Sequence, residues 1–120
     1  MTPTILIVED HAPLRATLRD WLAAAFDPCL IASAADGLEA VELARTHRPH
    51  LVLMDLDLPR LNGLEATRRI KAALPTTQVV MLTIYEDQAH RADAAAAGAS
   101  AYVPKRNLHH DLVPVINRLI

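Results

Sequence analysis

The sequence has little cysteine, little net charge and no long apolar segment, and each shortage excludes a class of protein. The one cysteine, Cys29, cannot form an internal disulfide, which suits a reducing compartment. A net charge of -2 gives no excess of positive charge of the kind that nucleic-acid-binding domains carry. The N-terminal segment lacks a basic region, and its apolar run is too short for a signal peptide or a membrane span. We therefore expect a soluble, cytoplasmic protein.

The sequence also contains no linker, no low-complexity tract and no internal repeat. Its 120 residues are close to the commonest length of a single domain. Hydrophobic residues make up 52% and charged residues 22% of the chain, as in ordinary globular proteins. We therefore expect one domain that spans residues 1–120, with no second domain in this chain.

Five short apolar runs are present, at residues 5–8, 29–32, 51–54, 79–82 and 101–103. Each is continuous rather than alternating, which is typical of strands that are buried on both faces of a parallel sheet. The segments between them have apolar residues at helical spacing. This alternation predicts an α/β fold, a doubly wound five-stranded parallel sheet of (βα)5 type, with right-handed crossovers that place helices on both faces.

Prolines and a glycine mark the predicted ends of the helices. Pro49 and Pro75 should end the second and third helices, and Gly98 can cap the fourth. Asn107 is a plausible cap for the last helix. Pro114 should either kink that helix or make it begin later than Asn107, because proline lacks the backbone N–H that a helix interior needs.

Polar side chains follow four of the five predicted strands. Glu9 and Asp10 follow the first, Asp55 the third, Thr83 the fourth and Lys105 the fifth. In an open parallel sheet the carboxyl ends of the strands lie at one edge, and ligands bind there. We therefore expect three carboxylates, a hydroxyl and an ammonium group to share one crevice.

Three clustered carboxylates repel one another unless a cation lies among them. Oxygen ligands in an open site suit Mg²⁺, which takes one or two carboxylates together with water and phosphate oxygens. A carboxylate beside Mg²⁺ can act as a nucleophile toward a phosphoryl group, while lysine supplies positive charge and threonine a hydrogen-bond donor. This chemistry explains why the apolar run 51–54 ends on Asp55, which is predicted to accept a phosphoryl group.

With these residues in register, the whole chain resembles the receiver domain of two-component response regulators, which has a CheY-like, flavodoxin-like fold. The motifs that carry the resemblance are the pair Glu9–Asp10, Asp55 in LVLMDLDLPRLNG with Pro59 and Gly63 behind it, Thr83 in VVMLT, and Lys105 after GASAYVPK. The segments LTIYED and GASAYVPKRNL look most like receivers that precede LuxR-type helix-turn-helix output domains.

The resemblance implies a role for each residue at this edge. Asp55 would take its phosphoryl group from a sensor histidine kinase, and Glu9, Asp10, Asp55 and the backbone carbonyl of Asp57 would help to hold Mg²⁺. The chain would be a switch rather than an enzyme. Many receivers have a cis peptide bond to a proline after the lysine, whereas in this chain Arg106 follows.

The resemblance also implies how the signal leaves the site. Thr83 and Tyr102 would relay phosphorylation to the binding surface. DNA would be contacted only through an output domain that residues 1–120 do not contain. The apolar stripe Leu108, Leu112 and Ile116 offers a surface that could pair with a second copy, so we expect weak homodimerisation that phosphorylation enhances.

Two other functions stay open at this point. The segment DLD, residues 55–57, also resembles the nucleophile motif of Mg²⁺-dependent haloacid-dehalogenase-type phosphatases, although that family places the motif at its first strand and needs a longer chain. Turnover of many phosphoesters would favour the phosphatase, and a single stoichiometric phosphorylation the receiver. A receiver-like interaction module that ignores phosphate is the other alternative, and the complete set of site residues argues against it.

Overall fold

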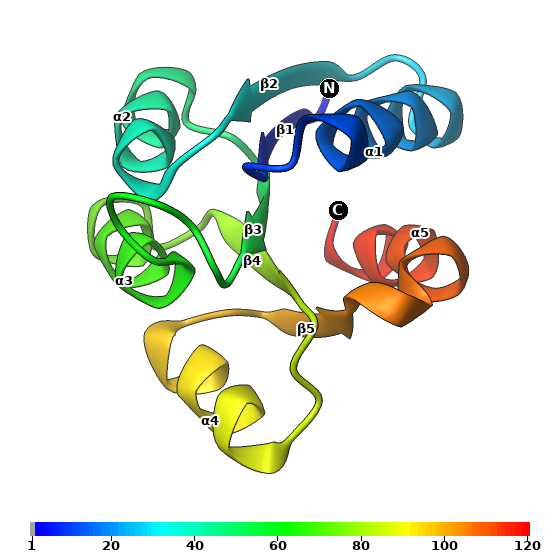
Figure 1. Ribbon diagram of the computed structural model, residues 1–120. Coiled ribbons are helices and arrows are strands. Elements are labelled where there is room, and N and C mark those ends of the chain that lie inside the picture. The colour runs from blue at the N-terminus through cyan, green and yellow to red at the C-terminus, as the bar shows by residue number, and fades with distance from the viewer. Residues whose placement is uncertain (1) are drawn as a thin grey trace.

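The computed structural model describes residues 2–120, which form five parallel strands, five α-helices and one 3₁₀-helix in alternating order (Figure 1). The strands are β1 (Thr4–Val8), β2 (Leu30–Ala34), β3 (Leu51–Asp55), β4 (Gln78–Thr83) and β5 (Ala101–Pro104). The helices are α1 (Ala12–Ala25), α2 (Gly37–His47), α3 (Gly63–Ala73), α4 (Gln88–Ala97), the 3₁₀-helix η1 (Lys105–Asn107) and α5 (Leu108–Leu119).

The strand order is β2-β1-β3-β4-β5, and every neighbouring pair is parallel. The chain adds β2 on one side of β1 and then returns to add β3 on the other side, so the order reverses between β1 and β3. This reversal is the switch point at which open α/β sheets bind ligands. The predicted doubly wound (βα)5 fold is confirmed.

Two apolar cores lie on the two faces of the sheet. Alternate residues of each central strand enter opposite cores: Ile7 and Leu53 contact the core that α1 and α5 cover, whereas Leu6 and Met54 contact the core that α2, α3 and α4 cover. Figure 1 shows the two groups of helices on opposite sides of the sheet. Burial on both faces explains the continuous apolar runs.

The edge strand β2 differs from the expectation of a strand buried on both faces. It has one neighbouring strand, and Leu30 at its start is 61% exposed. By contrast, every residue of β3 in the middle of the sheet is buried. A run of apolar residues identified the strand, but only the strand order decided how deeply it lies.

The predicted helix ends agree with the structure, except at α5. α2 and α3 end before Pro49 and Pro75, and Gly98 caps α4 with a φ of 107°. Of the two alternatives for Pro114, the later start is wrong, because α5 starts directly after Asn107 and continues through Pro114. Pro114 is exposed, so the backbone carbonyl that lacks a partner in the preceding turn is open to water.

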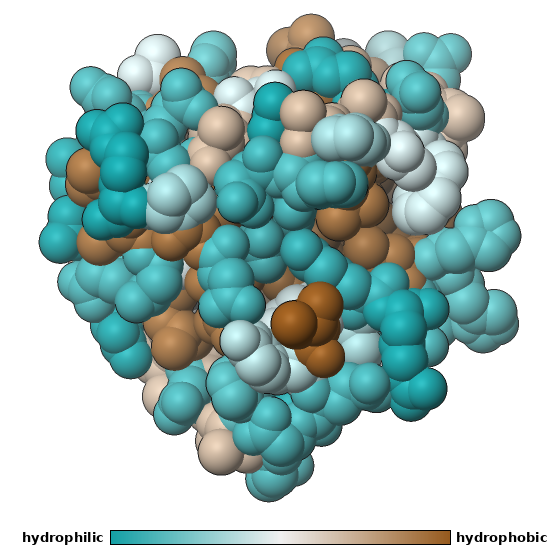
Figure 2. Space-filling model, viewed as in Figure 1, coloured by the Kyte–Doolittle hydropathy of each residue, from teal (hydrophilic) through white to brown (hydrophobic). Residues whose placement is uncertain are grey.

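The apolar stripe of α5 is not a free surface. Leu108, Leu112 and Ile116 are at most 4% exposed and belong to the core between α5 and the sheet. The expected pairing of this stripe with a second copy is therefore wrong, because the sheet of the same chain already covers it. On the face drawn in Figure 2, apolar atoms form only small patches within a mainly hydrophilic surface.

Within residues 2–120, no helix has both the length and the apolar character that crossing a membrane requires.

Candidate functional site

The carboxyl ends of β1, β3, β4 and β5 bring the predicted site residues to one edge of the sheet. Glu9 directly follows β1, Asp55 is the last residue of β3, Thr83 is the last of β4, and Lys105 directly follows β5. The register aligns these ends, because Asp55 pairs with Leu82 and the next residue of β4 is Thr83. The crevice therefore lies beside the switch point between β1 and β3.

Lys105 joins two buried carboxylates across this crevice. Its Nζ lies 3.1 Å from Oε2 of Glu9 and 3.2 Å from Oδ2 of Asp55. The side chains of Glu9 and Asp55 are 1% and 5% exposed, respectively. Burial of a charged group is costly unless the group is paired, and one ammonium here serves two carboxylates.

Asp10 completes an acidic cluster at the rim. One oxygen each of Glu9, Asp10 and Asp55 lie within 4.8 Å of one another, and Asp10 is exposed whereas the other two are buried. Although Oε2 of Glu9 lies near the lysine, it has no hydrogen-bond partner. A buried oxygen that accepts no hydrogen bond, beside two further carboxylates, belongs to a set of oxygen ligands that suits a hard cation such as Mg²⁺.

The environment shifts the proton affinity of both partners in the central ion pair. Burial, and then the charge of Glu9, raise the pKa of Asp55 to about 7, and Lys105 and the backbone N–H of Asp57 offset this only in part. Burial by itself would lower the pKa of Lys105, but Asp55 and Glu9 raise it overall. The lysine therefore stays charged, while the crowded carboxylates would gain from additional positive charge.

The backbone around Asp55 leaves no room for a side chain at Gly63. A Cβ atom there would lie 2.1 Å from the carbonyl oxygen of Asp55, and the Gly63 N–H donates to the carbonyl of Leu56 at 2.9 Å. This close approach explains the glycine eight residues after the acidic residue. In the same turn the N–H of Asp57 donates to Oδ1 of Asp55 at 3.3 Å.

Sequence reasoning missed Arg15. Its Nη1 donates to the backbone carbonyl of Glu9 at 2.6 Å, and so ties the first turns of α1 to the acidic cluster. No sequence signal marked this residue, because an arginine on an amphipathic helix is usually solvated. The bond appears only once α1 packs beside the end of β1.

The backbone of Tyr85 connects the two residues that were predicted to relay the signal. Its N–H donates to the hydroxyl of Thr83 at 3.1 Å, and its carbonyl accepts from the hydroxyl of Tyr102 at 2.7 Å. The guanidinium of Arg91 lies 4.7 Å from the centre of the Tyr102 ring. Thr83 and Tyr102 are thus coupled through a single peptide segment of the β4–α4 loop.

Tyr85 also reaches the acidic crevice. A hydrogen bond with the carboxylate of Asp57 raises the pKa of the Tyr85 hydroxyl. Its ring stacks on His90 with centroids 4.1 Å apart and planes 6° from parallel. Among residues 2–120 the one cis peptide bond joins Asp27 to Pro28, so the bond between Lys105 and Arg106 is trans.

The fold and the site define a doubly wound α/β protein with an acidic, lysine-bridged crevice at its switch point. Residues 5–117 match the family model of the response regulator receiver domain. The chain belongs to this family, as its sequence predicted. Receiver domains are the input modules of two-component response regulators.

Curated relatives agree with this assignment. Over 109 residues the chain is 38% identical to the uncharacterized transcriptional regulatory protein YhcZ of Bacillus subtilis, covering 91% of this chain and 51% of that protein. Over 104 residues it is 46% identical to protein-glutamate methylesterase/protein-glutamine glutaminase 4 of Myxococcus xanthus, covering 84% of this chain and 29% of that protein. The chain therefore spans about half, or less, of the length of these relatives.

Solved structures show the same fold. A two-component response regulator of the LuxR family from Aurantimonas is 35% identical, with a TM-score of 0.90 over 98% of this chain and 84% of that one. A DNA-binding response regulator of the LuxR family from Staphylococcus aureus is 26% identical, with a TM-score of 0.90 over 98% of both chains. Receiver domains of transcription regulators are typically not enzymes, and the family match favours the receiver over the phosphatase alternative.

Proposed function

We propose that Asp55 is the phosphoacceptor of this receiver domain and that a sensor histidine kinase is its phosphodonor. The observation that carries the proposal is the bridge from Lys105 to Asp55 and Glu9 beside a third carboxylate. A carboxylate oxygen of Asp55 attacks the phosphorus, the P–N bond to the kinase histidine breaks, and the imidazole leaves with its electron pair and takes up a proton. The product is an acyl phosphate on Asp55.

The neighbouring side chains support this transfer electrostatically. Lys105 favours the carboxylate form of Asp55 against the effect of burial, and its ammonium can move onto an oxygen of the incoming phosphoryl group. Glu9, Asp10, Asp55 and the carbonyl of Asp57 would hold Mg²⁺. When bound, Mg²⁺ would neutralise charge on the phosphoryl oxygens. The buried Oε2 of Glu9, which accepts no hydrogen bond although it lies near Lys105, supports this assignment.

We propose that Thr83 and Tyr102 carry the change outward. The hydroxyl of Thr83 now accepts from the N–H of Tyr85. A phosphoryl oxygen on Asp55 would give that hydroxyl a strong acceptor, and its rotation would alter the segment that holds Tyr102. Phosphorylation can shift the population of the two arrangements only through such contacts, which differ between them.

The proposed output of this switch is supported by the relatives rather than by the described residues. Several of them are named transcriptional regulators and are longer than this chain. We propose that residues 1–120 act as a receiver unit in the cytoplasm and control transcription through an output domain, which would make the DNA contacts.

The acceptor assignment is tested by phosphorylation with acetyl phosphate and Mg²⁺, followed by intact mass measurement and peptide mapping. We expect the wild type to gain the mass of one phosphoryl group on the peptide that contains Asp55. Asp55→Asn should fold and gain none. Asp57→Asn, a matched change two residues away that keeps the backbone carbonyl, should still be labelled. Labelling of Asp55→Asn at the wild-type stoichiometry would show that another residue is the acceptor.

A further inference from the structure

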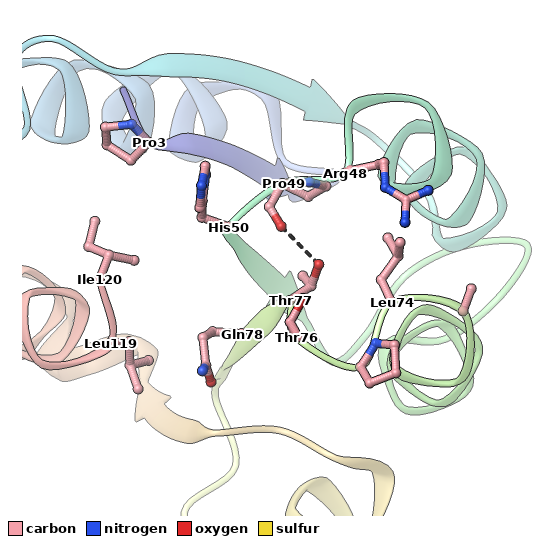
Figure 3. Close-up of a pocket in the computed structure, with 12 residues that line it drawn as sticks. Pro3, Arg48, Pro49, His50, Leu74, Thr76, Thr77, Gln78, Leu119 and Ile120 are labelled. Atoms are coloured by element: carbon pink, nitrogen blue, oxygen red, sulfur yellow. Dashed lines mark hydrogen bonds between the residues drawn. The ribbon is translucent and has the colours of Figure 1, made fainter. Parts of the chain in front are cut away.

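A pocket of about 620 Å³ lies at the opposite edge of the sheet from Asp55, where β1, β3 and β4 begin (Figure 3). Four segments form it: the residues before β1, the α2–β3 connection, the end of α3 with the α3–β4 connection, and the end of α5. Its volume is within the range of roughly 300–1,000 Å³ that is usual for small-molecule sites. Nothing in the phosphoacceptor chemistry uses this pocket.

Several backbone acceptors around the pocket are already occupied. The carbonyl of Pro49 accepts from the Thr77 hydroxyl at 2.8 Å, which is the dashed line in Figure 3. The carbonyls of Pro75 and Thr77 accept from Nζ of Lys71 at 2.7 and 2.8 Å. No aspartate or glutamate is among the residues that line the pocket in the described part of the chain. A ligand that brings hydrogen-bond donors or positive charge would therefore find few partners.

Donors, in contrast, remain available. Nδ1 of His50 accepts from the N–H of Thr4 at 3.0 Å, so the neutral ring carries its proton on Nε2. Oε1 of Gln78 accepts from the Ser100 hydroxyl, which leaves the amide NH₂ group as a donor. Figure 3 shows His50 and Gln78 on the side of the pocket near Ile120.

Arg48 supplies a cation on the other side, near Leu74 (Figure 3). Arg48 is the C-cap residue of α2 and has a left-handed backbone conformation with a φ of 47°. This conformation sets the direction in which its side chain leaves the backbone. Within residues 2–120 its guanidinium takes part in no ion pair. A guanidinium without a counter-ion at a pocket that lacks acidic side chains selects for an anion, and a planar carboxylate matches its geometry.

We propose that this pocket binds a small carboxylic acid with an apolar body. The carboxylate would pair with Arg48, and His50 and Gln78 would donate to an acceptor at the far end of the ligand. The apolar body would lie against the proline and aliphatic side chains between these ends, among them Leu74 and Leu119. Such a site offers apolar walls on which a ring can lie and polar groups that fix its orientation.

The test is a titration of the ¹⁵N-labelled protein with 4-acetylbenzoate, which has a carboxylate, a ring and a far acceptor. We expect saturable shifts of the amide signals of Arg48, His50 and residues 76–78. Arg48→Gln should weaken binding by about tenfold or more, because it removes the charge-assisted pair. Arg45→Gln, an equal loss of charge on an exposed position of the same helix, should bind as the wild type does. The uncharged 4-acetylbenzamide should bind more weakly than the acid.

Three results would overturn the proposal. One is the absence of saturable shifts at these amides at millimolar probe. Another is equal affinity for the acid and its amide. The third is an equal loss of affinity in Arg48→Gln and Arg45→Gln, which would mean attraction by overall charge alone. Phosphorylation of Asp55 is not needed in any arm, so the result does not depend on the proposed switch.

Discussion

At the scale of single residues, the chemistry of the site depends most on the burial of Asp55 beside Glu9. Burial and like charge raise the pKa of Asp55 to about 7, although Lys105 lies 3.2 Å away. One ammonium shared by two carboxylates does not compensate for removing both from water. The site therefore holds a carboxylate that is reactive because its charged form is poorly stabilised until further positive charge arrives.

This arrangement predicts how stability depends on pH in metal-free buffer. The folded-state pKa of Asp55 lies above the ordinary value of 3.8 for an aspartate, so the folded protein binds the proton more tightly than the unfolded chain does. Its contribution to stability is complete below pH 3.8 and is lost as the pH rises toward about 7. We expect the free energy of unfolding to fall over this range by up to about 4 kcal/mol from this group.

Urea denaturation at several pH values, with a metal chelator present, measures this slope. Asp55→Asn should lose most of it, because the amide does not titrate. Asp57→Asn should retain it. If Asp55→Asn and the wild type show the same pH dependence between pH 4 and 7, the burial of Asp55 does not have the energetic effect assigned to it.

At the scale of elements, the β4–α4 loop connects the site to the face formed by α4 and β5. The backbone of Tyr85 is held at its N–H by Thr83 and at its carbonyl by Tyr102. Arg91 of α4 lies over the Tyr102 ring and joins the helix to the strand. The two bonds hold the two adjacent peptide groups that meet at the Cα atom of Tyr85, so a change at one bond can be passed to the other through this residue.

We expect Thr83→Ala to leave the phosphoryl site at Asp55 intact but to prevent the structural change at Tyr102 and Arg91. Beryllofluoride, a phosphoryl mimic, should bind beside Asp55 in the variant as in the wild type. In the wild type the NMR signals of Tyr102 and Arg91 should shift on binding, and in Thr83→Ala they should stay near their free positions. Thr46→Ala, on an exposed face of α2, is the matched control. Full shifts at Tyr102 in Thr83→Ala would rule out the relay through Thr83.

At the scale of the whole molecule, the two edges of the sheet have different chemistry. The carboxyl edge gathers acidic groups around one lysine, whereas the amino edge has the pocket with Arg48 and free donors. Two apolar cores lie between these edges and hold the strands in register. Binding at either edge should therefore act on the stability of the entire domain, because a domain of this size commonly unfolds as one unit.

For the acidic edge, we expect Mg²⁺ to raise the melting temperature of the wild-type domain. A ligand that binds only the folded state, at 100 times its Kd, stabilises it by roughly 2.7 kcal/mol. Asp10→Asn should reduce the increase, because it removes one carboxylate of the cluster. Asp20→Asn, an exposed change on α1, should leave it unaltered. Calorimetric scans with and without Mg²⁺ measure the change in melting temperature. An equal change in Asp10→Asn and the wild type would exclude Asp10 as a ligand.

The sequence by itself determined the alternation of strands and helices, and through it the fold. Continuous apolar runs of strand length are costly to expose to water, so these runs had to become strands of a sheet. In a parallel sheet the ends of the first, third and fourth runs carry Glu9, Asp55 and Thr83 to one edge. Helix ends near Pro49, Pro75 and Gly98 followed from local backbone chemistry. These properties depend on near neighbours in the chain, which a sequence displays.

Only the tertiary structure decided the features that depend on distant residues. The exposure of β2 followed from its place at the edge, and the stripe of α5 was buried because the sheet lies against it. The bond from Arg15 to Glu9 and the pocket at Arg48 join segments whose contact no local pattern encodes. The pKa of Asp55 likewise depends on how deeply its carboxylate is buried and on its distances from Glu9 and Lys105. Only the folded chain determines the burial and these distances.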